Sequence, residues 1–74
     1  MAKKSEAEAI YKIVEVIGTS TVSWEEAAMN AVGAAAHSLR DLRIAEVVKM
    51  DMKVDKGKAV AFRTRVLLSF KYEL

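Results

Sequence analysis

The sequence predicts an α+β fold in which a strand, a helix and two further strands form a three-stranded antiparallel sheet curled over one helix. Residues 10–17 are short and rich in β-branched side chains, residues 24–39 carry alanines at helical spacing, and residues 42–74 alternate apolar with charged side chains. A helical crossover places the first two long strands in the same direction, so the last strand should return between them as the antiparallel partner of both.

The first half of the chain has clear start and stop signals. The run at 10–17 is expected to be a mostly buried strand that ends in the Gly-Thr-Ser-Thr segment 18–21. Ser23 and Glu26 have the spacing of a capping box, with the Glu26 side chain reaching back to the Ser23 backbone. The helix should then run about sixteen residues to Leu39, or about 24 Å. Its stripe of small residues would let it approach the sheet closely, and Trp24 at its start is expected to pack within that stripe.

The last third of the chain predicts one long hairpin about a turn at residues 55–58, where Gly57 can adopt a positive φ. The expected apolar rows are Ile44, Val48, Met50, Met52 and Val54 on the first arm, interrupted by Glu46, and Val60, Phe62, Val66, Leu68, Phe70 and Tyr72 on the second. Each arm of about 12 residues would span about 40 Å, whereas a compact chain of this size is only about 30 Å across. The hairpin therefore predicts self-association to cover its apolar face.

Composition narrows the class of protein. The 74 residues contain no cysteine, so disulfides and thiolate metal sites are excluded, and oligomerisation is the remaining support for so small a core. The net charge of +2 is spread among interleaved acids and bases, which disfavours nucleic-acid binding, and no apolar run is long enough for a membrane span. We expect a cytoplasmic protein with a flexible N-terminal arm at 1–9, which lacks the apolar region of a secretory leader, and a single domain at 10–74.

Catalytic motifs are scarce. His37 is the single histidine, the serines lack a nucleophile motif, and the three glycines are too far apart for a phosphate-binding loop, so we do not expect an enzyme. Four carboxylates on predicted strands or the turn could hold a hard cation or pair with basic side chains, and salt bridges are the expectation: Glu15, Glu46, Asp51 and Asp55. No metal ligand set is assigned.

Several segments in order resemble the dodecin family. The matching segments are 11–20, 23–27, 39–42, 45–48 and 66–70, so the resemblance covers about residues 10–72. It implies a hollow, cytoplasmic homododecamer of cubic symmetry with no catalytic activity, which agrees with the excess length of the hairpin.

The resemblance also identifies two candidate ligand positions. Dodecins that bind flavin use a tryptophan on the long hairpin and a glutamine in the last strand, and the matching residues here are Ile44 and Arg63. Trp24 stands at the helix start and does not replace the missing tryptophan. Flavin binding is therefore expected to be weakened or lost, and Arg63 is left to pair with a phosphate or with Glu46.

The same two replacements, with the run at 51–55, make the chain similar to calcium-associated dodecins, so calcium is a second candidate ligand by resemblance. The leading expectation is a non-enzymatic dodecameric shell that binds or stores a small ligand or ion. Two alternatives stay open. One is a protein that binds and stores flavin (FMN, riboflavin or FAD), and the other is a structural particle without a ligand.

Overall fold

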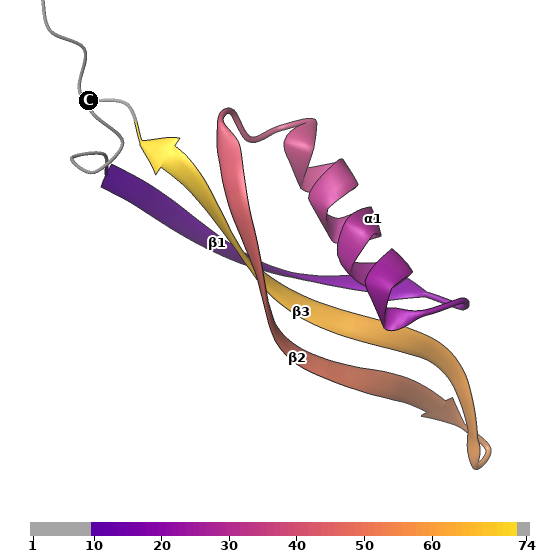
Figure 1. Cartoon of the computed structure of the whole chain (residues 1–74). Helices are drawn as coiled ribbons and strands as arrows, with labels where there is room; N and C mark the ends of the chain where they lie inside the picture. Colours follow the sequence, from indigo (N-terminus) through magenta and orange to yellow (C-terminus); the bar gives the residue numbers. More distant parts are fainter. Residues whose placement is uncertain (1–9, 73–74) are drawn as a thin grey trace, which may run out of the picture.

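A computed structural model of the chain describes residues 10–72, except for the side chain of Tyr72. The elements are β1 (Ile10–Ser20), α1 (Trp24–Ala36), β2 (Leu42–Asp55) and β3 (Lys58–Tyr72). The strand order is β1-β3-β2, with β3 antiparallel to both neighbours. Figure 1 shows α1 lying against one face of the strongly twisted sheet. The predicted α+β topology is confirmed, while the expected arm at 1–9 and residues 73–74 lie outside the described part.

Strand β1 runs past its predicted end. Residues 18–20 remain paired with β3, Gly18 opposite Thr64 and Ser20 opposite Phe62, so the expected break at 18–21 was placed too early. Gly18 is required here for space, because a Cβ atom at this position would overlap the Ala27 carbonyl oxygen and lie 2.9 Å from the Ala31 Cβ. The turn follows at Ser20, whose Oγ accepts a hydrogen bond from the Val22 N–H at 2.9 Å.

Helix α1 begins as predicted and ends earlier. Ser23 Oγ accepts a hydrogen bond from the Glu26 N–H at 3.0 Å, which satisfies one donor of the first turn. The second bond of the expected capping box, from the Ser23 N–H to the Glu26 side chain, is replaced by another. The Ser23 N–H donates instead to Ser20 Oγ at 3.4 Å. The helix ends at Ala36 rather than Leu39, and the chain then turns at Asp41, whose φ of 55° is one that aspartate tolerates better than most residues.

The core lies between α1 and the middle of the sheet. Ala31 of the helix packs with Val66 and Leu68 of β3, the last two fully buried. Ala27 is also fully buried, so the predicted stripe of small helical residues does face the sheet. Partly buried apolar side chains complete this core: Val16, Ala28, Val32, Ala35, Leu39 and Leu42.

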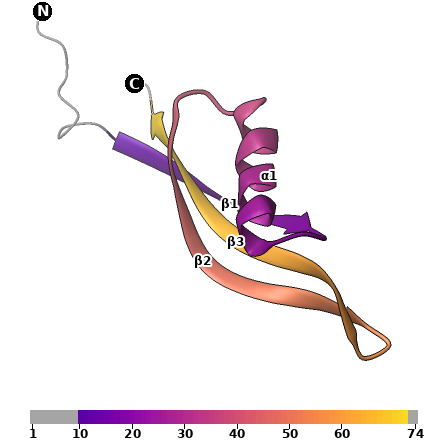
Figure 2. The same ribbon diagram turned by 45° about the vertical axis from the view of Figure 1, so that its right-hand side comes forward.

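The hairpin is as elongated as predicted. Its turn is the two residues Lys56 and Gly57, with φ of 51° and 78°, the double positive φ of a type I′ hairpin turn. The Cα radius of gyration is 15.4 Å, with extents of 61 × 20 × 15 Å, whereas a compact chain of this length would have a radius of gyration of about 11 Å. In Figure 2 the turn of the hairpin projects beyond α1 and β1.

The predicted face of β2 is wrong along part of its length, because β-bulges reverse the alternation. Val47 pairs with Val66 and Lys49 with Arg65, which leaves Val48 as an extra residue without a partner. On the turn side of this bulge, Met50 and Met52 lie on the helix side of the sheet, as expected. On the other side, Ile44 pairs with Ser69 and lies on the opposite face. Glu46 therefore does not interrupt an apolar row, since it and Ile44 both lie on the face away from the helix.

Helix α1 packs mainly on β1 and β3 and barely contacts β2. The helix-side residues Val47, Met50 and Met52 of β2 are consequently exposed, Met50 at 57%. We call these three residues the β2 strip. Together with Val54 near the turn and Met29 on α1, they leave large apolar side chains facing solvent in the isolated chain. None of the helices in the described part is long and apolar enough to cross a membrane.

Candidate functional site

The two candidate positions lie on the face of the sheet away from α1, which we call the open face. Strand pairing arranges this face in rows that cross β1, β3 and β2. One row contains Ile13, Ser69 and Ile44, so two exposed isoleucines flank a serine. Another row, nearer the hairpin turn, contains Thr19, Arg63 and Asp51.

A single chain does not bring the two candidate positions together. Ile44 lies opposite Ser69, six residues from Arg63 along β3, and six residues of strand span about 20 Å. A small ligand that contacted both Ile44 and Arg63 would therefore have to take them from two copies of the chain.

Arg63 is held in a two-point ion pair with Asp51. Its Nε lies 2.7 Å from Asp51 Oδ1 and its Nη2 lies 2.9 Å from Oδ2, so both carboxylate oxygens accept a hydrogen bond. The expectation that Arg63 would pair with Glu46 is wrong. Glu46 lies opposite Leu67, four residues farther along β3, whereas Asp51 is directly opposite Arg63.

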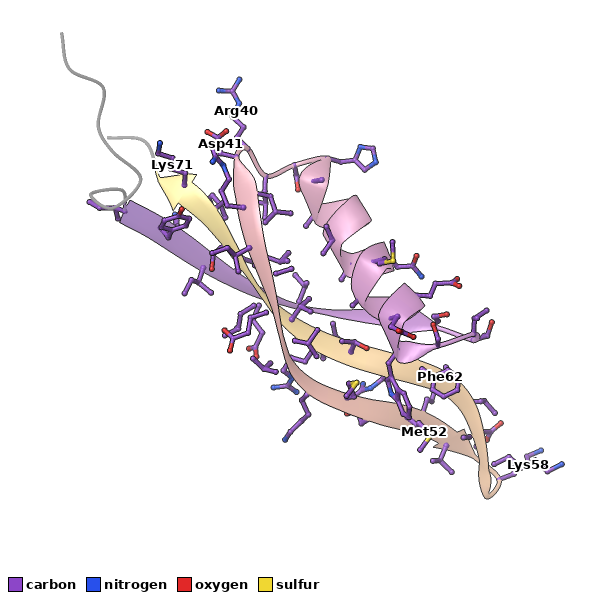
Figure 3. All side chains as sticks on the ribbon, in the orientation of Figure 1. Arg40, Asp41, Met52, Lys58, Phe62 and Lys71 are labelled. Atoms are coloured by element: carbon purple, nitrogen blue, oxygen red, sulfur yellow. The ribbon has the colours of Figure 1, made fainter. Side chains whose placement is uncertain are left out.

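Trp24 links the start of α1 to the backbone of Asp51. Its indole Nε1–H donates to the Asp51 carbonyl oxygen at 2.9 Å. Trp24 lies on the helix side of the sheet, whereas the Asp51 side chain and its ion pair lie on the open face. The Trp24 carbonyl accepts from the Thr64 hydroxyl at 2.8 Å, and the ring meets Phe62 edge-on with centroids 4.9 Å apart. Figure 3 shows Phe62 and Met52 on the stretch of hairpin just beyond the first turn of α1. Trp24 thus packs within the subunit, as predicted.

The ion pair is charged throughout the neutral range. The hydrogen bond from Arg63 lowers the pKa of the Asp51 carboxyl, against a smaller opposing effect of desolvation, and the charges of Arg65 and Lys49 lower it further. The same hydrogen bond raises the pKa of Arg63. Because the pKa of Asp51 is depressed on folding, the pair stabilises the fold above the ordinary aspartate pKa of about 3.9. This stabilisation is lost as the pH falls through the lower pKa of the folded state.

The other predicted carboxylates are distributed along the sheet. Glu15 Oε2 lies 3.6 Å from Arg65 Nη1, a second ion pair on the open face, so two of the four carboxylates form the expected salt bridges. Within residues 10–72, no group of three or more His, Cys, Asp or Glu side chains is arranged to hold a metal ion. His37 lies exposed at the C-cap of α1.

The sequence predicted a salt bridge at Asp51 but did not single out Arg63 as its partner, and the role of Thr64 was missed. Thr64 is 1% exposed, in the apolar row of β3, and its position between Phe62 and Val66 was a readable signal of a buried hydroxyl in need of a partner. The pairing of Asp51 with Arg63 in particular had no such signal. Counting outward from the Asp55–Lys58 pair without a bulge places Met50 opposite Arg63, and only the register shift between Lys53 and Val54 brings Asp51 there.

Comparisons with known proteins identify the family of this chain. The family model described as Dodecin matches residues 10–73, nearly the whole chain. The chain belongs to the dodecin family. A protein named calcium dodecin, from Mycobacterium tuberculosis strain ATCC 25618 / H37Rv, is 44% identical over 62 residues, which are 84% of this chain and 87% of that protein. The predicted family is therefore confirmed.

Solved structures of other dodecins share the fold. Dodecin from Streptomyces coelicolor superimposes with a TM-score of 0.84 at 29% identity, covering 92% of this chain and 97% of that one. The crystal structure of the M. tuberculosis calcium dodecin, described as a calcium-chelating antigen with a novel calcium-binding site, gives a TM-score of 0.77 at 42% identity. That match covers 86% of this chain and 91% of the M. tuberculosis chain. The predicted order of strand, helix, strand and strand is thus that of the family.

Proposed function

We propose that this chain is the subunit of a non-enzymatic homododecameric shell, in the cytoplasm, that binds or stores a small ligand or ion, with flavin binding weakened or lost. The observation that carries the proposal is the apolar surface that one chain leaves uncovered. The β2 strip, Val54 and Met29 are all exposed in a chain whose longest dimension is 61 Å. Soluble monomers rarely expose large contiguous apolar patches, so other copies of the chain would cover this surface.

Calcium is the first candidate ligand. The support is the 44% identity to a protein named calcium dodecin, together with the replacement of the flavin-stacking tryptophan by Ile44. The carboxylates of the open face that form no ion pair within residues 10–72, Glu46 among them, supply the oxygen donors that calcium prefers.

Flavin is the second candidate. The row of Ile13, Ser69 and Ile44 presents apolar side chains around a small residue, a surface on which a planar ring could lie. An aliphatic surface lacks the aromatic stacking that contributes about 1 kcal/mol per ring beyond area burial. We therefore place flavin below calcium.

Titration of the assembled protein with each ligand distinguishes these functions. After treatment with a chelator, calorimetric titration with Ca²⁺ should show saturable binding that an equal concentration of Mg²⁺ does not reproduce, and the oligomer should survive chelation. Riboflavin and FMN at tens of micromolar should show no saturable fluorescence quenching. Quenching that saturates at a fixed ratio of flavin to subunit would instead establish flavin storage. Absence of binding in both titrations would leave the structural particle as the function.

A further inference from the structure

One edge of the Arg63 guanidinium has no partner among residues 10–72. Nε and Nη2 both donate to the Asp51 carboxylate, at 2.7 and 2.9 Å. The remaining nitrogen, Nη1, carries two N–H donors and has no hydrogen-bond acceptor among the described residues. The Arg63 side chain is 40% exposed on the open face, so this edge is accessible to a ligand in the isolated chain.

The orientation of that edge is fixed from several directions. The Asp51 carboxylate accepts hydrogen bonds from two guanidinium nitrogens, and this bidentate contact prevents rotation of the guanidinium plane. The backbone of Asp51 is held by the Trp24 indole at 2.9 Å. On β3, both neighbours of Arg63 also contact Trp24, Phe62 through its ring and Thr64 through its hydroxyl. A donor that is already ordered loses little conformational entropy when a ligand binds it.

We propose that Asp51 is a positioning residue that fixes Arg63 so that its Nη1 edge donates to an uncharged acceptor oxygen, such as a ring carbonyl, of a ligand on the open face. This inference rests on the proposed function, in which the open face binds a small ligand. The Asp51 carboxylate favours an uncharged acceptor, because it would repel a phosphate brought to the same guanidinium. The neighbouring cation Arg65 is in turn compensated by Glu15, at 3.6 Å. Lys49 and Lys53 are the remaining cations, each one row away, on either side of the row that holds Arg63 and Asp51.

The test uses riboflavin and FMN as probes in an Ile44→Trp background, where an aromatic stack makes flavin binding measurable. Asp51→Asn should weaken riboflavin binding about tenfold, since the amide cannot grip both guanidinium nitrogens, and Asp51→Glu should recover part of the loss. Glu15→Gln, which removes the other arginine–carboxylate pair of the open face, is the matched control and should leave the affinity unchanged. The mass of the assembly should be the same for all variants. Unchanged or tighter riboflavin binding in Asp51→Asn would overturn the proposal, as would a selective gain for FMN.

A second measurement does not need a bound ligand. In ¹⁵N NMR spectra of the wild-type protein, the two Nη nitrogens of Arg63 should give separate resonances, because the two-point pair blocks rotation, and they should merge in Asp51→Asn. A single averaged Nη resonance in the wild type would overturn the positioning role. If Ile44→Trp binds no riboflavin while the Nη resonances are separate, the open face as a flavin site fails and the fixed orientation of Arg63 stands.

Discussion

Replacing Gly18 by alanine is expected to destabilise the subunit by about 3 kcal/mol or more, a large fraction of the stability of so small a domain. The new Cβ would overlap the Ala27 carbonyl oxygen and lie 2.9 Å from the Ala31 Cβ. Both obstacles belong to the segment of α1 that packs directly on β1, and one of them is backbone. The helix must therefore move away from the sheet, which loosens the contact of Ala31 with Val66 and Leu68. Chemical denaturation followed by circular dichroism measures the loss.

Gly33→Ala is the matched control for this substitution. Gly33 also lies within a regular element, but a Cβ there would meet no atom of the described residues within 4 Å, apart from the neighbouring backbone of α1 itself. The change should raise the free energy of unfolding by about 0.5 to 1 kcal/mol, since alanine favours the helix over glycine. Equal stability of Gly18→Ala and the wild type would show that the helix does not pack on the sheet as closely as described.

Replacing Ile44 by tryptophan together with Arg63 by glutamine is expected to raise the affinity for riboflavin by about tenfold. Ile44 is 54% exposed on the open face, so a larger ring can be accommodated there without disturbing the core. The gain comes from an indole stacked on the flavin ring in place of an aliphatic side chain. Without Arg63 the Asp51 carboxylate loses its ion-pair partner. The Asp51 side chain is already about half exposed, so water can solvate the carboxylate. Quenching of flavin fluorescence measures the affinity.

The matched control for the flavin experiment is Ile17→Trp. Ile17 is also exposed and lies on the same face of the sheet, in the row of Arg65 and Lys49. If any aromatic ring on the open face sufficed, this variant would gain affinity as well. We expect no gain from it. A double substitution at Ile44 and Arg63 that binds no better than the wild type would mean that the surrounding pocket differs from that of flavin-binding dodecins.

Local signals were sufficient to predict the elements of this fold. Ser23 caps the helix whose alanines face the sheet, and the pair Lys56 and Gly57 makes a two-residue turn, because both features depend on neighbours in sequence. The end of β1 was predicted too early, because a glycine usually interrupts a strand. Gly18 instead lies within β1 and allows Ala27, nine positions away in the sequence, to approach the strand closely. Such a contact has no signature in the local pattern.

The candidate site was predicted less completely than the fold. Ile44 and Arg63 follow from family resemblance, but the faces on which they lie depend on bulges, one of them at Val48. A bulge shifts the register by one residue and reverses the side-chain alternation, and nothing in the run of valines at 47–48 marks which residue is extra. The specific pairing of Arg63 with Asp51 was not assigned for the same reason.

The mass of the native particle shows whether copies of this chain assemble into a shell. Native mass spectrometry at micromolar concentration, supported by sedimentation velocity, measures it without a ligand or a substitution. We expect a single species of about twelve times the 8.2 kDa of one chain, in which copies of the chain cover the β2 strip. A mass close to 8.2 kDa would contradict this expectation, because the exposed apolar side chains would then face water in the functional protein.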